Sequence, residues 1–347
     1  MKALILAGGK GTRLRPLTVY TPKPIVPVVN RPFLLYQIEI LRRAGIEDIT
    51  LSLNYQPDKI RHLLGDGGEF GVNIDYVTEP QPMGTAGAYK YAVAPEDGPT
   101  IVLNGDILTD MVVKRVIDAH KDSGAAATIC LAEVEDASSY GLVRTDTALN
   151  VTSFVEKPDA DQLATESVNH INAGVYILEP SVLDLIQADA NCSFEYEVFP
   201  KLLENESAFK AHVLEDEYWC DIGTPEKYLQ AHMDFLGGRI RRFDIERETE
   251  DGEIATAASV DGKSVIADNC IIKPNAVIRN SVIGEGVQIE ERAVIENSVI
   301  WPHTHISNNA LVSGAVIAKS CYIGKNARVT AGSVLGDKSS LTDYTSV

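Results

Sequence analysis

Glycine and arginine residues follow directly on an apolar run near the start of the chain. The run Ala3-Leu4-Ile5-Leu6-Ala7 leads into Gly8-Gly9-Lys10-Gly11-Thr12-Arg13-Leu14-Arg15-Pro16. The run has the length of a buried parallel strand, and the glycines after it let the backbone turn sharply. At such a turn the main-chain N–H groups can approach phosphate oxygens, and the guanidinium groups of Arg13 and Arg15 add positive charge. The pattern predicts a phosphate site.

The glycine spacing differs from two better-known phosphate loops. It lacks the Gly-Lys-Ser/Thr ending of a Walker loop and the third glycine of the dinucleotide fingerprint. Together with Pro22-Lys23-Pro24, the stretch resembles the opening motif of the sugar-phosphate nucleotidyltransferases. The resemblance implies catalytic roles for Arg13 and Lys23. It implies nucleotide contacts from Leu6, Ala7, Gly8, Gly9, Gly11, Thr12 and Arg13.

Two aspartates are candidates for a metal site. Asp106 ends Leu103-Asn104-Gly105-Asp106, so a strand would deliver its carboxylate to the carboxyl edge of the sheet, where open α/β sheets bind ligands. Mg²⁺ needs only one or two carboxylates besides phosphate oxygens and water, although Asn-Gly-Asp is also a common turn. Asp221 lies in Trp219-Cys220-Asp221-Ile222-Gly223-Thr224-Pro225, which resembles the family's second magnesium motif. The spacing alone leaves open whether the two carboxylates meet; the resemblance implies that both bind Mg²⁺.

Further stretches resemble the family in the family's order. Gly84-Thr85-Ala86-Gly87 resembles the nucleotide loop, which implies nucleotide contacts from Gly84 and Thr85. Tyr140-Gly141, Val155-Glu156-Lys157-Pro158 and Asn172-Ala173-Gly174 resemble segments around the sugar phosphate. The resemblance assigns the sugar phosphate to Asn104, Gly141, Glu156, Lys157 and Asn172.

Glu79 bears on the choice of base. An ionised carboxylate offers only acceptors, which suits the adjacent N1 and N2 donors of guanine, although Glu79 could equally face solvent. The segment Ser193-Phe194-Glu195-Tyr196-Glu197-Val198-Phe199-Pro200 resembles one in mannose-1-phosphate guanylyltransferases. We therefore expect GTP and mannose 1-phosphate to give GDP-mannose and pyrophosphate. The alternatives are a glucose-1-phosphate thymidylyl- or uridylyltransferase, and a non-catalytic regulatory subunit that binds nucleotide sugar.

The chain organisation predicts two cores. Strand-like and helix-like segments alternate over the first two-thirds, which predicts an α/β, Rossmann-like nucleotidyltransferase domain with a mixed, mostly parallel sheet at 1–236. We expect helices at 34–44 and 60–64 and strands at 3–7, 49–53, 74–77 and 100–103. Gly237-Gly238 and the charged stretch after it predict a linker at 237–258.

An aliphatic residue then recurs every six positions, with single-residue slips after the sixth and ninth. The markers are Val265, Ile271, Val277, Ile283, Ile289, Ile295, Ile300, Ile306, Val312, Ile317, Ile323, Val329 and Leu335. This period is typical of hexapeptide repeats and predicts a C-terminal left-handed parallel β-helix of about four coils at 259–347. We expect the β-helix to serve homo-oligomerisation; catalytic His303 or His305 would instead indicate acyl transfer.

The composition fits these expectations. A formal net charge of −18 argues against nucleic-acid and membrane-surface partners. Five scattered cysteines without a Cys-x-x-Cys pair favour free thiols in a reducing compartment. Because the first apolar run is too short for a signal peptide, we expect a cytoplasmic protein.

Overall fold

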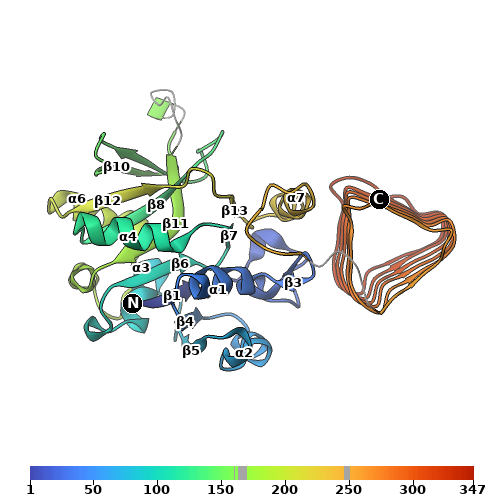
Figure 1. Cartoon of the computed structure of the whole chain (residues 1–347), viewed down its shortest axis with the longest axis horizontal. Coiled ribbons are helices and arrows are strands. Elements are labelled where there is room, and N and C mark those ends of the chain that lie inside the picture. Colours follow the sequence, from blue (N-terminus) through green and yellow to red (C-terminus); the bar gives the residue numbers. More distant parts are fainter. Residues whose placement is uncertain (160, 163–169, 246–250) are drawn as a thin grey trace. The chain divides into compact units, whose positions relative to one another are not determined.

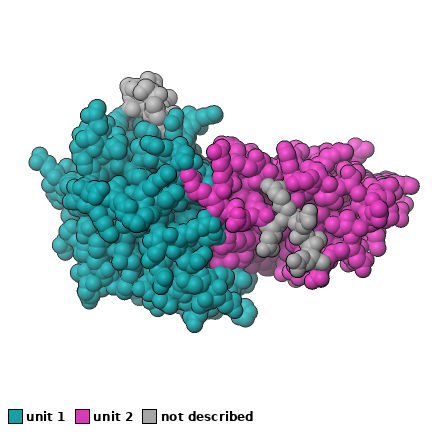
Figure 2. Space-filling model, in the orientation of Figure 1, with its two compact units in different colours: residues 1–9, 36–219 teal, residues 10–35, 220–347 magenta. Residues whose placement is uncertain are grey.

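The structure is a computed structural model that describes residues 1–159, 161–162, 170–245 and 251–347. It divides into two compact units, coloured teal and magenta in Figure 2. Unit 1 contains residues 1–9 and 36–219, and unit 2 contains residues 10–35 and 220–347. The stretch 10–35, called here the Lys10–Leu35 segment, thus clusters with the C-terminal part of the chain. Residues 246–250 of the predicted linker lie outside the described residues.

Unit 1 is built on a nine-stranded mixed sheet. Strands β6, β1, β4 and β5 are adjacent and parallel, and β11 joins β6 antiparallel. Strand β8 pairs with both β11 and β12, and β9 and β10 complete the sheet. The sheet strands are β1 (Lys2–Leu6), β4 (Asp48–Leu53), β5 (Asn73–Thr78), β6 (Thr100–Asn104), β8 (Ala127–Glu133), β9 (Gly141–Thr145), β10 (Val151–Glu156), β11 (His170–Leu178) and β12 (Phe209–Val213).

Helices pack on this sheet, as Figure 1 shows for α3 and α4. Helix α3 contacts β1 and β4, and α4 contacts β8, β11 and β12. The helices of unit 1 are α1 (Leu34–Arg43, of which Leu34 and Leu35 fall in unit 2), α2 (Pro57–Leu64), α3 (Gly84–Ala92), α4 (Val113–Ser123) and α6 (Phe199–Glu204), with a π-helix η6 (Phe194–Val198) and 3-10 helices η3 (Gly68–Phe70), η4 (Pro95–Asp97) and η5 (Pro180–Leu185). Every helix and strand expected at the sequence level between residues 3 and 103 is present, within a few residues of its predicted ends.

A cluster of aromatic residues lies in the otherwise mainly aliphatic core of unit 1. Phe194 and Phe199 stack with ring centroids 5.6 Å apart, and Tyr176 from β11 packs against both. All three side chains are fully buried. The Rossmann-like fold predicted for this part of the chain is confirmed.

Unit 2 begins with short elements and one long helix. The Lys10–Leu35 segment contains two 3-10 helices, η1 (Thr12–Leu14) and η2 (Lys23–Ile25), and a hairpin of β2 (Pro27–Val28) with β3 (Arg31–Pro32). Helix α7 (Pro225–Leu236) starts at Thr224, whose hydroxyl accepts a bond from the Lys227 amide. Two short strands adjoin the predicted metal ligands along the chain: β7 (Ile107–Thr109) of unit 1 directly follows Asp106, and β13 (Trp219–Asp221) ends at Asp221. The boundary between the units falls within β13.

The rest of unit 2 is a solenoid of short parallel strands with a triangular section (Figure 1). Its three sheets are named by the order of their strands along one coil. Sheet 1 holds β14 (Glu253–Ile254), β17 (Ile271–Ile272), β20 (Gln288–Ile289), β23 (His305–Ile306), β26 (Tyr322–Ile323) and β29 (Ser340–Leu341). Sheet 2 holds β15 (Ser259–Val260), β18 (Val277–Arg279), β21 (Val294–Glu296), β24 (Leu311–Ser313) and β27 (Arg328–Val329). Sheet 3 holds β16 (Val265–Ile266), β19 (Val282–Ile283), β22 (Val299–Ile300), β25 (Val316–Ile317) and β28 (Val334–Leu335).

The predicted parallel β-helix is confirmed, but its first markers are one residue out of register. Ile266, Ile272 and Ile278 point into the solenoid core, and the predicted Val265, Ile271 and Val277 are their outward neighbours. A single-residue slip therefore also follows Ile278, so that the paired strands of successive coils are mostly 17 residues apart. The strands described in the three sheets, six, five and five, make five full coils rather than four.

All five cysteines are free thiols, as predicted, and burial raises the pKa of four of them, Cys130, Cys192, Cys270 and Cys321. None of the described helices combines the length and the hydrophobicity that crossing a membrane requires.

Candidate active site

The candidate site of unit 1 starts at the carboxyl ends of its central parallel strands. The Ala7 amide donates to Ser52 of β4 at 2.9 Å, and the Gly105 amide donates to Leu6 of β1 at 2.9 Å. A Cβ on Gly105 would lie 2.7 Å from the Leu6 oxygen, so only glycine allows this approach. The turns that carry Gly8 and Asp106 therefore leave the sheet side by side, at the edge where open α/β sheets bind ligands.

Glu79 is directed toward the glycine turn. Its Oε1 accepts a bond from the Ser52 hydroxyl at 2.9 Å, and its Oε2 accepts one from the Met83 amide at 3.2 Å. A Cβ added to Gly8 would lie 3.0 Å from the same Oε1. Because the carboxylate is fixed beside a turn suited to phosphate, it can accept further hydrogen bonds from a ligand bound there.

The predicted nucleotide residues Gly84 and Thr85 form close contacts with another part of unit 1. Gly84 has a φ of +71°, and a Cβ there would lie 2.4 Å from the Cys192 oxygen, so packing against Cys192 requires glycine. The Thr85 hydroxyl donates to Glu195 at 2.9 Å and accepts a bond from the Phe194 amide at 2.9 Å. The Thr85 side chain thus fixes the start of η6.

Two carboxylates, of Glu156 and Glu195, lie near the residues predicted to bind the sugar phosphate. A Cβ on Gly141 would lie 2.9 Å from Glu156 Oε2, so the two predicted residues face each other. Burial, followed by the negative charge of Glu195, raises the pKa of Glu156, and the Lys157 ammonium acts in the opposite direction. Lys157 itself has a φ of +51°, and its amide donates to Tyr140 at 2.9 Å. Two carboxylates near one another can accept bonds from neighbouring hydroxyl groups of a sugar.

Asn172 and Asn104 lie at the junction of β11 and β6. Asn172 donates to the Tyr176 hydroxyl at 2.8 Å and accepts a bond from the Gly174 amide at 2.8 Å. A Cβ on Gly174 would lie 2.7 Å from Asn104 Nδ2, so the two asparagines approach each other through this glycine. The buried Oδ1 of Asn104 has no hydrogen-bond partner within the described chain. It is a ready acceptor for a ligand hydroxyl.

Unit 2 holds the predicted residues Gly11, Thr12, Arg13, Lys23 and Asp221. A Cβ on Gly11, where φ is +60°, would lie 2.9 Å from Lys23 Cβ, so the glycine and lysine pack together. Gly223 is the second meeting point, because a Cβ there would lie 2.8 Å from Asp221 Oδ2 and 3.4 Å from an Arg13 guanidinium nitrogen. Asp221 also accepts a hydrogen bond from the ammonium of Lys227, at 2.5 Å.

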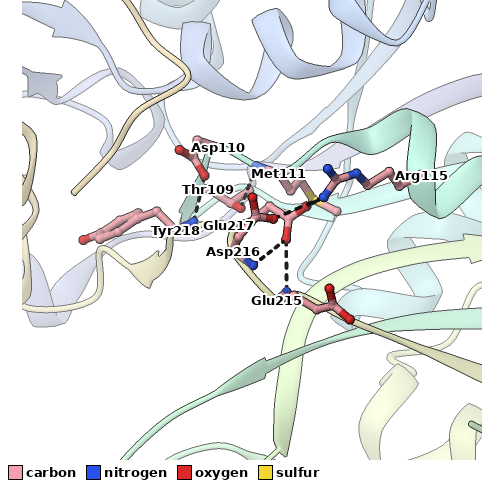
Figure 3. A network of polar contacts seen from close by, with 8 residues as sticks. All are labelled: Thr109, Asp110, Met111, Arg115, Glu215, Asp216, Glu217 and Tyr218. Atoms are coloured by element: carbon pink, nitrogen blue, oxygen red, sulfur yellow. Dashed lines mark hydrogen bonds and ion pairs between the residues drawn. The ribbon is translucent and has the colours of Figure 1, made fainter. Parts of the chain in front are cut away.

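A polar network within unit 1, drawn in Figure 3, joins the stretch 109–115 to the stretch 215–218. Asp110, four residues after Asp106, accepts a bond from the Tyr218 amide at 2.7 Å and donates its own amide to the Tyr218 oxygen at 3.3 Å. Arg115 at the start of α4 pairs with Glu217 at 3.1 Å. Within unit 1, the stretch 215–218 is therefore held against the stretch 109–115.

Asp106 and Asp221 each offer carboxylate oxygens, the donor type that a hard divalent cation prefers. Among the described residues no three His, Cys, Asp or Glu side chains cluster as a ready-made metal site. Mg²⁺ does not need such a cluster, since it is usually held by one or two carboxylates together with substrate phosphates. The Asp221 carboxylate forms an ion pair with the Lys227 ammonium, so this position accepts a positively charged group.

Comparison with known proteins identifies the family. The family described as nucleotidyl transferase matches residues 2–237. The chain belongs to this family. Residues 247–347 of this nucleotidyl transferase match a second family, described as the EIF2B subunit epsilon LbH domain.

Similar proteins share most of the catalytic part. The nucleotidyl transferase is 40% identical over 275 residues to a mannose-1-phosphate guanyltransferase of Debaryomyces hansenii, covering 77% of this chain and 72% of the relative. It is 39% identical over 273 residues to the mannose-1-phosphate guanyltransferase of Saccharomyces cerevisiae, covering 77% and 71%. The crystal structure of HddC from Yersinia pseudotuberculosis, complexed with GMP-PN, is similar with a TM-score of 0.56 and 34% identity, covering 67% of this chain and 99% of HddC.

Sequence reasoning missed two charged residues of the nucleotidyl transferase. The sequence marks Glu195 only as part of a segment that resembles the family, yet its charge acts on Glu156 and its carboxylate accepts a bond from the Thr85 hydroxyl. Its role could have been suspected from its position two residues after Ser193, whose side chain caps the start of η6. Lys227 carried no signal, because its pairing with Asp221 depends on how α7 begins.

Proposed function

We propose that the chain is a mannose-1-phosphate guanylyltransferase, which converts GTP and mannose 1-phosphate into GDP-mannose and pyrophosphate. The observation that carries the choice of base is Glu79. Its two bonds to Ser52 and Met83 direct the carboxylate toward the Gly8 turn. A carboxylate can accept bonds from both N1–H and N2–H of guanine, which no other common base offers as adjacent donors. The names of the yeast relatives and the GMP-PN complex of HddC support the same base.

The reaction needs no nucleophile from the protein. A phosphate oxygen of the sugar 1-phosphate attacks the α-phosphorus of GTP in line, and the bond to the leaving pyrophosphate breaks. The backbone around Leu6, Ala7, Gly8 and Gly9 lies next to the triphosphate, with Gly11, Thr12 and Arg13 contributing from the Lys10–Leu35 segment. Arg13 and Lys23 stabilise the charge that develops on the phosphoryl oxygens.

The sugar phosphate is held by a second group of residues. Glu156 accepts bonds from sugar hydroxyls, and Lys157 neutralises the phosphate and so keeps the attacking oxygen in position. The backbone of Gly141 and the amides of Asn104 and Asn172 line the same subsite. The closeness of Gly141 to Glu156 and of Asn104 to Gly174 supports a single subsite.

The proposed metal ion is Mg²⁺, and Asp106 and Asp221 would hold it. When bound, it neutralises charge on the triphosphate and polarises the α-phosphoryl group. The network around Asp110, Tyr218 and Arg115 keeps the chain next to both carboxylates ordered.

We also propose a domain division at 1–236, 237–258 and 259–347, a homo-oligomer formed through the β-helix, and a cytoplasmic location. Gel filtration coupled to light scattering measures the assembly. A monomer at micromolar concentration would contradict the oligomer.

Pyrophosphate release tests the function. The protein is supplied with Mg²⁺ and each of GTP, dTTP, UTP, ATP and CTP, against mannose 1-phosphate and glucose 1-phosphate. We expect release chiefly with GTP and mannose 1-phosphate. Preference for dTTP or UTP with glucose 1-phosphate would overturn the guanine assignment, and no release from any pair would indicate a regulatory subunit. Consumption of acetyl-CoA would instead point to acyl transfer at His303 or His305.

A further inference from the structure

One face of the solenoid differs from the other two. In each strand of sheet 3, one residue points into the solenoid core and the preceding one points outward. The outward residues of its first four strands are nonetheless buried, at 1–3% exposure, whereas those of the other sheets include exposed Gln288, Tyr322 and Arg328. The buried outward residues are Val265, Val282, Val299 and Val316. Four stacked valines thus form an apolar stripe that other parts of the chain cover.

Contacts with the rest of unit 2 lie at the carboxyl ends of these same strands. The side chain of Asn30, in the turn between β2 and β3, donates to the Ile283 oxygen of β19 at 2.9 Å. A Cβ on Gly336, directly after β28, would lie 3.1 Å from Pro16 Cβ. Two different coils of the solenoid therefore touch the Lys10–Leu35 segment, one on each side of Lys23.

A third coil reaches the segment through a buried relay. Trp301 follows β22 directly, and its indole N–H donates to the Tyr228 hydroxyl of α7 at 2.9 Å. The Tyr228 hydroxyl in turn donates to the Pro27 oxygen at 2.5 Å. Trp301 is 3% exposed and Tyr228 is fully buried, so neither bond is in competition with bulk water. His232 packs edge-on against the Tyr228 ring and fixes its orientation.

The relay ends four residues after Lys23. The Val26 amide bonds to the Lys23 oxygen, and the Phe33 amide bonds to the Val26 oxygen, so η2 and the hairpin are linked. Movement at Pro27 is therefore passed directly to the backbone of Lys23. Displacement of a charge-stabilising group by about 1 Å can cost a hundredfold in rate.

We propose that sheet 3 of the solenoid is an intramolecular brace for the Lys10–Leu35 segment, and that Trp301 and Tyr228 are positioning residues for Lys23. The effect on catalysis rests on the proposed nucleotidyl transfer; the effect on the segment does not. The solenoid thereby serves the active site of its own chain, whatever its other faces do.

Tyr228→Phe removes the hydroxyl that joins Trp301 to Pro27 and keeps the ring. We expect kcat to fall by about tenfold or more while KM for both substrates stays within about threefold. Trp301→Phe should act in the same direction. Because both residues belong to one relay, the double variant should be no slower than the slower single variant.

Hydrogen exchange at the Ile25, Val26 and Phe33 amides gives a readout that does not depend on activity. In Tyr228→Phe we expect these amides to exchange at least about tenfold faster, because the bond at Pro27 no longer restrains the segment. Should this variant not fold, Asn30→Gly gives a second test, since glycine tolerates the φ of +61° and removes only the bond to Ile283.

Thr304→Val is the matched control. It also removes a buried hydroxyl from the solenoid, but the Thr304 bonds run to Ala318 and Cys321 within the solenoid. It should leave both kcat and the exchange of the three amides within about twofold of the unmodified protein. Equal effects of Tyr228→Phe and Thr304→Val, or none from either, would overturn the brace. An unmodified protein that releases no pyrophosphate would refute the proposed function instead, while the exchange comparison would still decide on the brace.

Discussion

Replacing Glu79 with glutamine tests the guanine assignment, because the change keeps the shape of the side chain and removes its charge. The carboxylate accepts one bond from Ser52 and one from the Met83 amide. An ionised carboxylate has about four acceptor positions, so roughly two remain for a ligand. That number matches the N1–H and N2–H donors of guanine.

The size of the effect follows from these two bonds. Glutamine offers one acceptor oxygen, and its NH₂ group would face a guanine donor. Each bond to a charged acceptor contributes about 1.5–3 kcal/mol. Loss of one such bond corresponds to about a 10- to 150-fold decrease in kcat/KM for GTP, since about 1.4 kcal/mol is one factor of ten. The value for dTTP should change far less, because thymine lacks the second donor.

Pyrophosphate release at saturating mannose 1-phosphate gives kcat/KM for GTP and dTTP in parallel. Asp75→Asn is the matched control, since it removes one negative charge from an exposed position on β5, four residues before Glu79. We expect the GTP-to-dTTP ratio to fall at least tenfold in Glu79→Gln and to stay unchanged in Asp75→Asn. The reasoning is refuted if Glu79→Gln keeps the ratio within twofold while the protein remains folded.

Three further outcomes are expected. Asp106→Asn should lower kcat at saturating Mg²⁺ by at least about 100-fold with an unchanged circular dichroism spectrum; normal turnover would contradict the metal assignment. Gly84→Ala should lower the free energy of unfolding by about 2–4 kcal/mol in urea titrations, since the added Cβ would meet the Cys192 oxygen at 2.4 Å. Gly124→Ala has a φ of +61° in the left-handed region and open space around the Cβ, so it should cost only about 1–2 kcal/mol, and an equal loss would disprove the clash. Burial lowers the pKa of His232 from 6.5 to about 4. Between these two pH values the unfolded chain binds a proton at this histidine that the folded chain does not. The free energy of unfolding should therefore fall by about 3 kcal/mol as the pH drops from about 6.5 to 4. Urea midpoints of His232→Gln should lack this part of the pH dependence; identical pH profiles would refute it.

The sequence predicted best those parts of the fold that follow from a local pattern, namely the first strand and the repeats of the solenoid. The first strand and the glycine turn after it were predictable because a buried parallel strand is a continuous apolar run. The solenoid was predictable from its six-residue period, but the first three markers were wrong by one residue. Val265-Ile266, Ile271-Ile272 and Val277-Ile278 are pairs of aliphatic residues, and a period cannot tell which of two neighbours points inward. Some later strands carry a polar outer residue, as in Gln288-Ile289 and Arg328-Val329, and this removes the ambiguity there.

The candidate site was predictable as a set of motifs rather than as contacts. Glu79 was singled out from its chemistry, but its anchoring by Ser52 depends on the pairing of β4 with β5. The roles of Trp301 and Tyr228 lay beyond sequence reasoning. Trp301 bonds to a residue 73 positions earlier, and Tyr228 to one 201 positions earlier, and no local pattern reports such pairs.

The discontinuity of unit 2 constrains the order in which the newly made chain can mature. The Lys10–Leu35 segment leaves the ribosome early, but its partners in unit 2 begin only at Cys220, after another 184 residues (36–219). At about 5–20 residues per second the segment waits roughly 10–40 s, with Leu14, Leu17 and Val26 exposed that are later fully buried. During that interval it is an apolar, cationic loop of the kind that chaperones bind. Because Ile283 and Gly336 are among its partners, the cationic groups proposed for the triphosphate become fixed only when nearly all of the solenoid has been translated.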